Sequence, residues 1–328
     1  MAFGFRLARS TLTLSVLAEE KWRGQSRAAS GGNMHSPLCV VPSGDATGEG
    51  AVWHALHKAL YWVDINRFLI HRFEPETGNV RNWLFSEPAV ALGLTDRPDT
   101  LIVALGSKLI LWQPANDARA DFANPERGRA GVRLNDGRPD PAGNFWVGSM
   151  ANNVGGDGED LTIERADMGK LFRVSPDGSA VTLKSGIGIS NTVCWSPDAT
   201  RFYSADTLAN TIFVWDFDPH TGRIAGERRF FGDFERGLPD GSAMDRDGFL
   251  WNARYGGGCV VRIAPTGEID RIVEMPVTNV TTCTFGGPQL KTLFITTARR
   301  ADERLSGGIF ALAVDVPGLA ENRFRLAG

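Results

Sequence analysis

Short runs of aromatic and aliphatic residues recur along this chain at regular intervals. Each run has the length and composition of a β-strand, because β-branched and aromatic side chains fit a pleated, half-buried surface. Successive runs begin about 40 to 57 residues apart, which is the range expected for the blades of a propeller. The six runs are residues 60–64, 100–104, 144–148, 201–206, 249–253 and 292–296.

A second strand with alternating polarity follows these runs, and a turn closes the pair. Residues 69–73 and 211–215 are examples of the second strand, and the turns include Pro-Glu-Thr-Gly at 75–78 and Pro-His-Thr-Gly at 219–222. Proline fixes φ in such turns, and glycine accepts a positive φ. No segment of convincing helical period reaches about ten residues. Six units of roughly four strands each therefore predict an all-β fold, a six-bladed β-propeller.

The propeller pattern covers the chain unevenly. We expect residues 34–328 to form the propeller domain, with the acidic, glycine-rich segment 152–168 as a loop at one mouth of the channel. Residues 1–33 lack the pattern: a short apolar run follows Arg6 and Arg9, but Glu19 and Glu20 come directly after it. We expect an N-terminal extension that is disordered or results from a start codon assigned upstream of Met34. A targeting segment is the alternative.

Composition excludes several classes of partner. The chain has 328 residues, 42% of them hydrophobic, and 38 acidic against 35 basic residues give a formal net charge of −3. This balance gives no electrostatic reason to expect nucleic acid or an anionic membrane as a partner. No apolar stretch approaches the ~18 residues needed to span a bilayer. The four cysteines lie far apart without a Cys-x-x-Cys pair, so we expect buried thiols in a reducing, cytoplasmic compartment.

Three oxygen-bearing side chains occupy equivalent places in the repeat. Glu49, Asn191 and Asp240 each precede a strand-like segment, and we expect each to lie on a loop just ahead of that strand. Equivalent loops of a circular repeat converge on one axis. Two carboxylates and a carboxamide meeting there would suit a hard divalent cation, which prefers oxygen ligands. The pattern predicts a metal site at one end of the central channel.

Further motifs accompany these residues in a fixed order. They are Arg-Leu-Asn-Asp-Gly at 133–137, Asp-Pro-Ala-Gly at 140–143, Gly-Ser-Met at 148–150, Asn-Val-Thr at 279–281, Phe-Gly-Gly at 285–287 and Thr-Thr-Ala-Arg at 296–299. At this spacing, the chain from about residue 39 to 312 resembles the family of gluconolactonase, regucalcin (senescence marker protein) and luciferin-regenerating enzyme. The resemblance implies one divalent cation, Ca²⁺, Zn²⁺, Mg²⁺, Mn²⁺ or Fe²⁺, held by Glu49, Asn191 and Asp240.

The resemblance also implies how a substrate is held. The substrate-contacting residues of the family fall on Arg133 and Asn135, and Asn153 stands near the place where some members contact the sugar through an acidic residue. That contact is altered here. Two other departures are Ala51 where proline is often found and Thr192 where glycine usually follows the Asn. Neither removes a ligand atom.

These residues predict a hydrolase that opens a sugar-acid lactone, such as an aldono-1,4- or 1,5-lactone, to the open acid. A cation polarises the carbonyl, and Asp240 is the expected base for the attacking water because one of its oxygens remains available to accept a proton. Arg133 and Asn135 are expected to orient the sugar hydroxyls. Asp136 and Asp140, in contrast, are expected to hold backbone amides of their loop.

Two other functions remain open at this point. The first is a phosphotriesterase or promiscuous esterase of the diisopropyl fluorophosphatase or paraoxonase type. Such enzymes often add a second, buried calcium, and the sequence contains no evident second carboxylate cluster. The second is a calcium-binding propeller without catalysis. A catalytic triad is disfavoured because no His stands beside a Ser or Cys in a nucleophile setting. The expected assembly is a monomer or a weak homo-oligomer.

Overall fold

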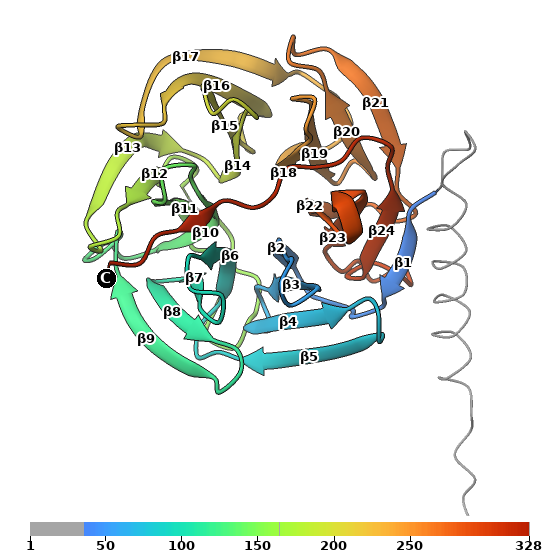
Figure 1. Ribbon diagram of the computed structural model, residues 1–328, viewed down its shortest axis with the longest axis horizontal. Helices are drawn as coiled ribbons and strands as arrows, with labels where there is room; N and C mark the ends of the chain where they lie inside the picture. Colours follow the sequence, from blue (N-terminus) through green and yellow to red (C-terminus); the bar gives the residue numbers. More distant parts are fainter. Residues whose placement is uncertain (1–35, 164, 328) are drawn as a thin grey trace, which may run out of the picture.

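Six sheets, one for each predicted repeat, are arranged around a central axis in the computed structural model (Figure 1). The structure describes residues 36–163 and 165–327, so the predicted N-terminal extension, residues 1–33, lies outside the described residues. The all-β, six-bladed propeller is confirmed. Within the described residues, the one helical element is the 3₁₀ turn η1 (Pro288–Leu290), and no helix is long and apolar enough to cross a membrane.

Each blade begins at the channel and proceeds outward by antiparallel pairing. The inner strands are β2 (Gly48–His54), β6 (Ala89–Thr95), β10 (Val132–Pro139), β14 (Ser190–Trp195), β18 (Leu238–Met244) and β22 (Val280–Gly286). The second strands are β3 (Ala59–Asp64), β7 (Leu101–Leu105), β11 (Phe145–Ala151), β15 (Arg201–Asp206), β19 (Leu250–Tyr255) and β23 (Thr292–Thr297). These second strands contain the six runs recognised in the sequence.

The third and fourth strands complete the blades. The third strands are β4 (Leu69–Glu74), β8 (Leu109–Gln113), β12 (Gly169–Val174), β16 (Thr211–Asp218), β20 (Cys259–Ile263) and β24 (Ile309–Ala313). The outer strands are β5 (Asn79–Leu84), β9 (Ala118–Ala123), β13 (Ala180–Ile187), β17 (Arg223–Gly232), β21 (Ile269–Glu274) and, in the last blade, β1 (Leu38–Val41). Burial falls from the inner to the outer strands, because the channel-side strands are covered on both faces.

Large aromatic side chains pack between neighbouring blades. The indole of Trp146 in β11 meets Trp195 of β14 edge to face at 5.5 Å, and Trp53 of β2 stacks on Phe294 of β23 at 5.7 Å. Such pairs add to the stabilisation from burying their apolar area. The Trp146 indole also donates to Asp140 Oδ2, and Asp140 Oδ1 accepts the amide of Asn144. The structural role predicted for Asp140 is confirmed.

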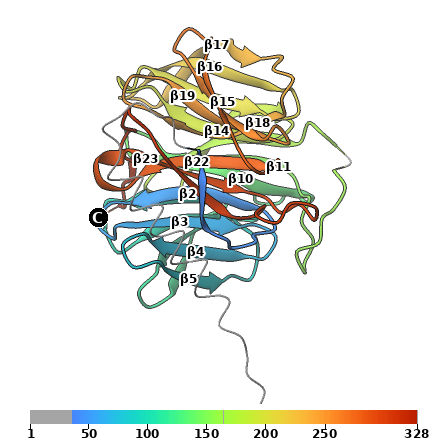
Figure 2. The ribbon, with the colours of Figure 1, turned by 90° about the vertical axis from the view of Figure 1, so that its right-hand side faces the viewer.

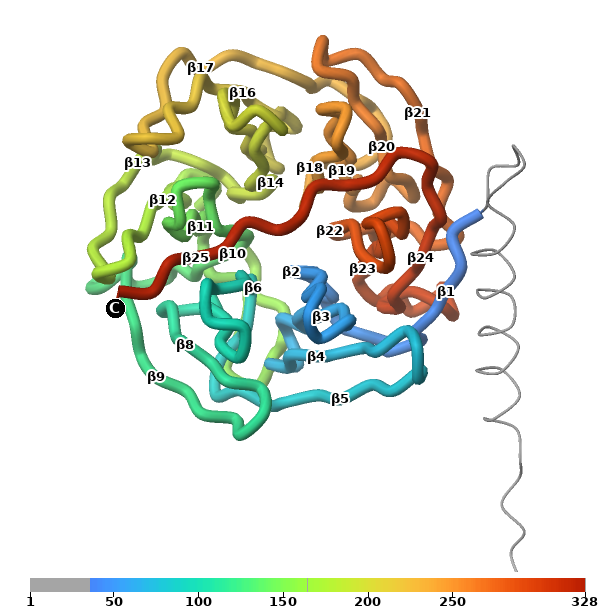
Figure 3. The backbone as a smooth tube through the Cα atoms, viewed as in Figure 1, coloured from blue at the N-terminus to red at the C-terminus, as the bar shows by residue number. Residues whose placement is uncertain are grey.

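The two ends of the described chain close the ring and cover the channel. β1 pairs with β24, so the sixth blade takes its outer strand from the beginning of the chain. After β24 the chain crosses one face of the propeller, and β25 (Arg323–Phe324) adds to the second blade by parallel pairing with β6 (Figure 3).

All four cysteines are free thiols, and Cys194, Cys259 and Cys283 are buried, while Cys39 is partly exposed. The expected burial is therefore confirmed for three of the four thiols but not for Cys39.

Candidate functional site

The three predicted ligands lie inside inner strands rather than on loops ahead of them. Glu49 is the second residue of β2, Asn191 the second of β14 and Asp240 the third of β18. The expected loop placement is therefore wrong, although all three side chains lie at the same end of the channel. The exposed fractions are 7% for Glu49, 4% for Asn191 and 8% for Asp240. A buried charge or polar group without a partner costs far more free energy than one exposed on a loop, so each of these side chains needs a partner.

A β-bulge explains this placement. The pairing register shifts just after the predicted ligand in two strands, between Glu49 and Val52 in β2 and between Asn191 and Cys194 in β14, and in β18 the shift between Pro239 and Ser242 spans Asp240. A bulge redirects a side chain and is common beside active sites. In β2 the bulge uses Gly50 at φ 57°, where a side chain would also come within 3.2 Å of the neighbouring blade. The sequence showed the glycine but not the bulge.

In β14 the bulge uses a threonine instead of glycine. Thr192 has φ 56° and is fully buried. A β-branched residue is strained in this region of φ. Its hydroxyl donates to the carbonyl oxygen of Asp240 and is 2.8 Å from Ser242 Oγ. The departure from glycine thus adds a link between the strands that carry Asn191 and Asp240.

Glu49 and Asp240 face each other directly. A hydrogen bond joins the two carboxyl groups, and burial together with nearby negative charge raises the pKa of Glu49 to about 8 and raises that of Asp240 well above its usual range. Two carboxylates in such contact need a proton or a cation between them. This pair therefore fits a bound divalent cation, which would replace the proton.

The predicted substrate-contacting residues form a network beside this pair. Arg133 Nε donates to Asn153 Oδ1 at 2.8 Å, and Arg133 Nη1 donates to Asn135 Oδ1 at 2.7 Å. Asn135 Nδ2 in turn donates to Asn191 Oδ1 at 3.0 Å. An amide oxygen has two lone pairs, so Asn191 Oδ1 retains one for a cation. The structure thus brings together all six residues selected from the sequence.

Arg133 supplies positive charge to the buried carboxylates. Burial lowers its pKa to about 10, while Glu49 and Asp240 act in the opposite direction. The guanidinium remains protonated near neutral pH. The positive charge of Arg133 offsets part of the repulsion between the Glu49 and Asp240 carboxylates. Its guanidinium, however, donates its hydrogen bonds to Asn135 and Asn153 and not to these carboxylates.

Asp136 is a member of the site that the sequence reasoning undervalued. Burial raises its pKa, and the backbone amides of Gly137, Val193 and Thr192 oppose that shift by hydrogen bonding to the carboxylate. The predicted contact with backbone amides is therefore confirmed. However, Asp136 Oδ2 has no hydrogen-bond partner among the described residues, and the charge of Asp136 raises the pKa of Glu49. The sequence feature that could have indicated a place for Asp136 in the site is its position next to Asn135 in a strand rich in polar residues.

A second acidic cluster lies at the junction of the first and sixth blades. Ligand atoms of Asp45, Asp64 and His71 lie within 4.8 Å of one another. The expectation of no second carboxylate cluster is therefore wrong, because β3 returns Asp64 to the loop that carries Asp45. The guanidinium of Arg67 pairs with both carboxylates, reaching Asp45 Oδ1 at 3.0 Å. Arg67 already provides the cationic partner of this cluster.

The mouth beside the ligands is bordered by the predicted insertion. The described residues of this insertion, 152–163 and 165–168, follow β11 and lie on the face opposite to the C-terminal tail, where the yellow-green loop extends in Figure 2. The loop reaches the first blade, since Asn66 Nδ2 donates to the Gly158 carbonyl at 2.9 Å and to Asp160 Oδ1 at 3.0 Å. The expected placement at one mouth of the channel agrees with these contacts.

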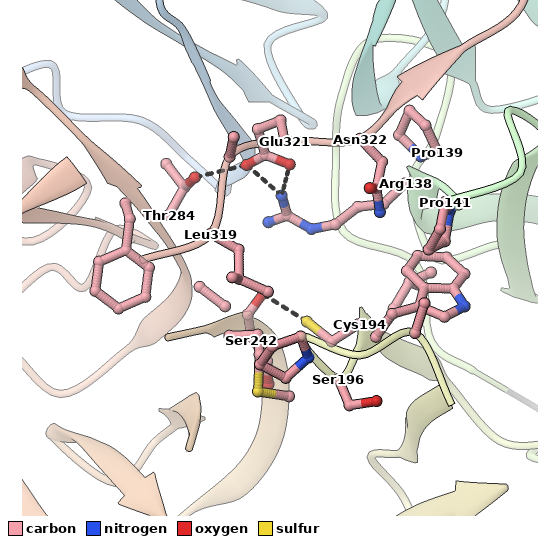
Figure 4. A pocket seen from close by; sticks show the side chains of 18 residues that line it. Arg138, Pro139, Pro141, Cys194, Ser196, Ser242, Thr284, Leu319, Glu321 and Asn322 are labelled. Carbon is pink, nitrogen blue, oxygen red and sulfur yellow. Dashed lines mark hydrogen bonds and ion pairs between the residues drawn. The ribbon is translucent and has the colours of Figure 1, made fainter. Parts of the chain in front are cut away.

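The opposite end of the channel holds a cavity of about 240 Å³ beneath the C-terminal tail (Figure 4). Glu321 of the tail accepts two hydrogen bonds from Arg138 Nη1, at 2.9 and 3.0 Å, and one from Thr284 Oγ1 at 2.8 Å. Arg138 lies near the far end of β10, whereas Arg133 lies near its beginning. This cavity is therefore separate from the carboxyl pair, and an ion pair already satisfies its buried charge.

Comparison with known proteins adds a family to this geometry. Residues 47–299 match the profile of the SMP-30/Gluconolactonase/LRE-like region. Pentonolactonase XacC of Haloferax volcanii is 34% identical over 297 residues, which cover 87% of this chain and 96% of the relative. The 6-deoxy-6-sulfogluconolactonase of Pseudomonas putida is 33% identical over 296 residues, covering 87% and 97%. Among solved structures, the calcium-binding protein regucalcin of Agrobacterium tumefaciens superposes with a TM-score of 0.82 at 26% identity, covering 89% of this chain and 98% of that chain.

Proposed function

Because the chain belongs to the SMP-30/gluconolactonase/LRE-like family, we propose that it is a metal-dependent hydrolase of sugar-acid lactones. The observation that carries the proposal is the buried carboxyl pair of Glu49 and Asp240 beside the Arg133–Asn135 network. Relatives named as a pentonolactonase and a sulfogluconolactonase support this substrate class.

Glu49, Asn191 and Asp240 would hold the divalent cation. Their oxygen donors suit Ca²⁺, Mg²⁺, Mn²⁺ or Fe²⁺, and an open site of this kind also accepts Zn²⁺. A similar structure described as a calcium-binding protein supports Ca²⁺ as one candidate. When bound, the cation supplies polarisation of the lactone carbonyl and stabilises negative charge on its oxygen.

Arg133 and Asn135 orient the sugar portion of the substrate. Arg133 has donors in a rigid, charged fork, which suits hydroxyl and carbonyl oxygens. Its present bond to Asn153 Oδ1 holds the guanidinium beside the mouth loop. Asn153 therefore contributes by positioning Arg133, and an amide there contacts sugar hydroxyls without adding another negative charge to the site.

Asp240 acts as the base. Its carboxylate accepts a proton from water as the water oxygen attacks the lactone carbonyl carbon. Collapse of the resulting intermediate breaks the ring C–O bond, and the released alkoxide takes the proton that Asp240 accepted and becomes a hydroxyl, which restores the Asp240 carboxylate. The product is the open hydroxy acid. No covalent bond to the protein is formed.

Purified protein assayed with a panel of aldono-1,4- and 1,5-lactones, with paraoxon, and with and without EDTA tests this function. We expect lactone hydrolysis that EDTA abolishes and that added divalent cation restores. Asp240→Ala should lose activity, by about 1000-fold or more for a group that is both ligand and base, and should retain its fold in circular dichroism. A fully active Asp240→Ala variant would remove both roles of Asp240, whereas hydrolysis of paraoxon alone would favour the phosphotriesterase alternative.

A further inference from the structure

A chain of side-chain hydrogen bonds continues past Asn191 into the fifth blade. Its first two bonds, from Arg133 to Asn135 and from Asn135 to Asn191, are described above. Asn191 Nδ2 then donates to Thr207 Oγ1 at 2.9 Å. Thr207 Oγ1 donates to the carbonyl oxygen of Pro239 at 2.7 Å. The chain therefore begins at the substrate-binding network and ends next to Asp240.

The two ends of this chain fix its direction. The guanidinium of Arg133 can only donate, and the Pro239 carbonyl can only accept. The single hydroxyl hydrogen of Thr207 is used on that carbonyl, so Thr207 can only accept from Asn191. The amide nitrogen of Asn191 must then point toward Thr207, and its oxygen must point away from it.

Burial makes this direction hard to reverse. The exposed fractions are 4% for Asn191, 7% for Asn135 and 6% for Thr207, so water does not readily replace the bonds. Rotating the Asn191 amide by half a turn would place its NH₂ group against the Asn135 donor and its oxygen against a hydroxyl that has no hydrogen left to give. It would also present a nitrogen that carries hydrogens, rather than an oxygen, to the cation.

We propose that Thr207 is a positioning residue that keeps the Asn191 amide oxygen facing the bound cation and links the strand of Asn191 to that of Asp240. This inference rests on the proposed metal site. Partners of metal ligands orient the ligand atoms, and their loss commonly weakens metal affinity by about 10- to 100-fold. Thr207 lies just after β15 and needs no contact with substrate to act in this way.

Thr207→Val tests the proposal, because it preserves the shape of the side chain and removes the hydroxyl. Ca²⁺ and Mn²⁺ are titrated by calorimetry into metal-free wild type, Thr207→Val and Thr207→Ser. We expect Thr207→Val to bind each cation about 10- to 100-fold more weakly, and Thr207→Ser to remain within about threefold of wild type. Equal affinity of Thr207→Val and wild type would overturn the proposal.

Thr297→Val is the matched control. Thr297, at the end of β23, is a fully buried threonine whose hydroxyl also donates to a backbone carbonyl, that of Gly308, at 2.8 Å. It makes no hydrogen bond to a ligand residue. The control should lose thermal stability comparably while its cation affinity stays at the wild-type value. An equal loss of affinity in Thr297→Val would mean that general destabilisation, not positioning, explains the Thr207 result.

The same titrations separate this proposal from the proposed function. If wild type binds neither Ca²⁺ nor Mn²⁺, or if Asp240→Ala binds them as wild type does, the metal site itself is wrong and the Thr207 role fails with it. If wild type binds, Asp240→Ala does not, and Thr207→Val is unaffected, the metal site stands and only the positioning role is refuted.

Discussion

At the scale of single residues, burial decides the chemistry of the acidic groups. A proton or a cation neutralises the negative charge shared by Glu49 and Asp240, whereas the Arg67 guanidinium neutralises charge on Asp45 and Asp64. His71 belongs to the second cluster: its Nε2 lies 3.4 Å from Asp45 Oδ1, and its ring stacks on Trp62. The same residue types thus form a candidate metal site in one place and a structural cluster in the other.

Asp45 and His71 predict opposite pH dependences of stability. Burial, with the charge of Asp64, raises the pKa of Asp45 from 3.8 to about 7, and burial lowers the pKa of His71 from 6.5 to about 4. Between about pH 4 and 6.5 the folded protein holds a proton on Asp45 and none on His71, and the unfolded chain holds the reverse. The two contributions therefore cancel in the wild type, because stability changes with pH only when the two states bind different numbers of protons.

Replacing either Asp45 or His71 should reveal the pH dependence of stability contributed by the other residue. In His71→Gln the His71 contribution is lost, so its free energy of unfolding, relative to wild type, should fall as pH rises from about 4 to 6.5. In Asp45→Asn the Asp45 contribution is lost, so the free energy of unfolding, relative to wild type, should rise from about pH 4 to 7. Urea unfolding of all three proteins across this range measures both slopes. Parallel curves for the two variants would contradict the assigned protonation states.

At the scale of elements, the inner strands both form the buried centre of the propeller and carry the candidate site residues. The pairing register shifts just after the predicted ligand in β2 and β14, and across the predicted ligand Asp240 in β18, at the mouth end of the channel. Strands β2, β14 and β18 therefore hold the predicted ligands within paired strands of the blades rather than on loops. Strand β10 adds polar side chains along the channel from Arg133 to Arg138. Sites on strands are positioned more accurately than sites on loops.

Ring closure by β1 gives a test at this scale. β1 covers the outer edge of β24, with Leu38 opposite Ala311 and Cys39 opposite Phe310. Deleting residues 1–41 exposes that edge and the apolar surface beneath it, so we expect a loss of several kcal/mol, roughly 5, or failure to fold. Deleting residues 1–33, which we assign to no blade, is the control and should leave the melting temperature near wild type.

Thermal unfolding followed by circular dichroism distinguishes these outcomes. If the variant that lacks residues 1–41 melted at the same temperature as the full-length protein, β1 would not be needed to close the ring. Unfolding after deletion of residues 1–33 would instead contradict the assignment of the propeller domain to residues 34–328.

At the scale of the whole molecule, the two ends of the channel carry different groups. The mouth end gathers Glu49, Asn191 and Asp240, and the far end is crossed by the C-terminal tail (Figure 3). The tail is anchored on both sides of the channel, by the bond from the Leu319 amide to the Met244 carbonyl and by β25. A substrate is therefore expected to enter and leave from the mouth that carries the insertion.

The ion pair between Arg138 and Glu321 predicts how the tail contributes to stability. Their side chains are 11% and 14% exposed, so Glu321→Ala leaves a buried charge without its partner. We expect that variant to lose about 3–5 kcal/mol, and the double variant Arg138→Met/Glu321→Leu to lose much less, because it removes both charges. Urea unfolding of the single and double variants measures the difference. A Glu321→Ala protein as stable as wild type would show that the tail does not depend on this pair.

The sequence alone determined the blade count, the turns and the three candidate ligands Glu49, Asn191 and Asp240, and its resemblance to a known family added Arg133, Asn135 and Asn153. Alternating polarity and Pro-Gly turns are local properties of the chain, so they can be recognised before folding. The expected order of motifs likewise placed Arg133 and Asn135 with Glu49, Asn191 and Asp240, and the structure brings them together.

Only the tertiary structure decided which groups become partners. The bond between Arg138 and Glu321 joins residues 183 positions apart, and that between Asn191 and Thr207 depends on the return of a neighbouring strand. The same holds for Asp45 and Asp64, whose meeting the sequence did not reveal, and for the Asp136 oxygen that has no hydrogen-bond partner within the described part of the chain. Bulges, buried charge and the direction of hydrogen bonds arise from contacts between strands and between blades, and no local pattern in the chain specifies such contacts.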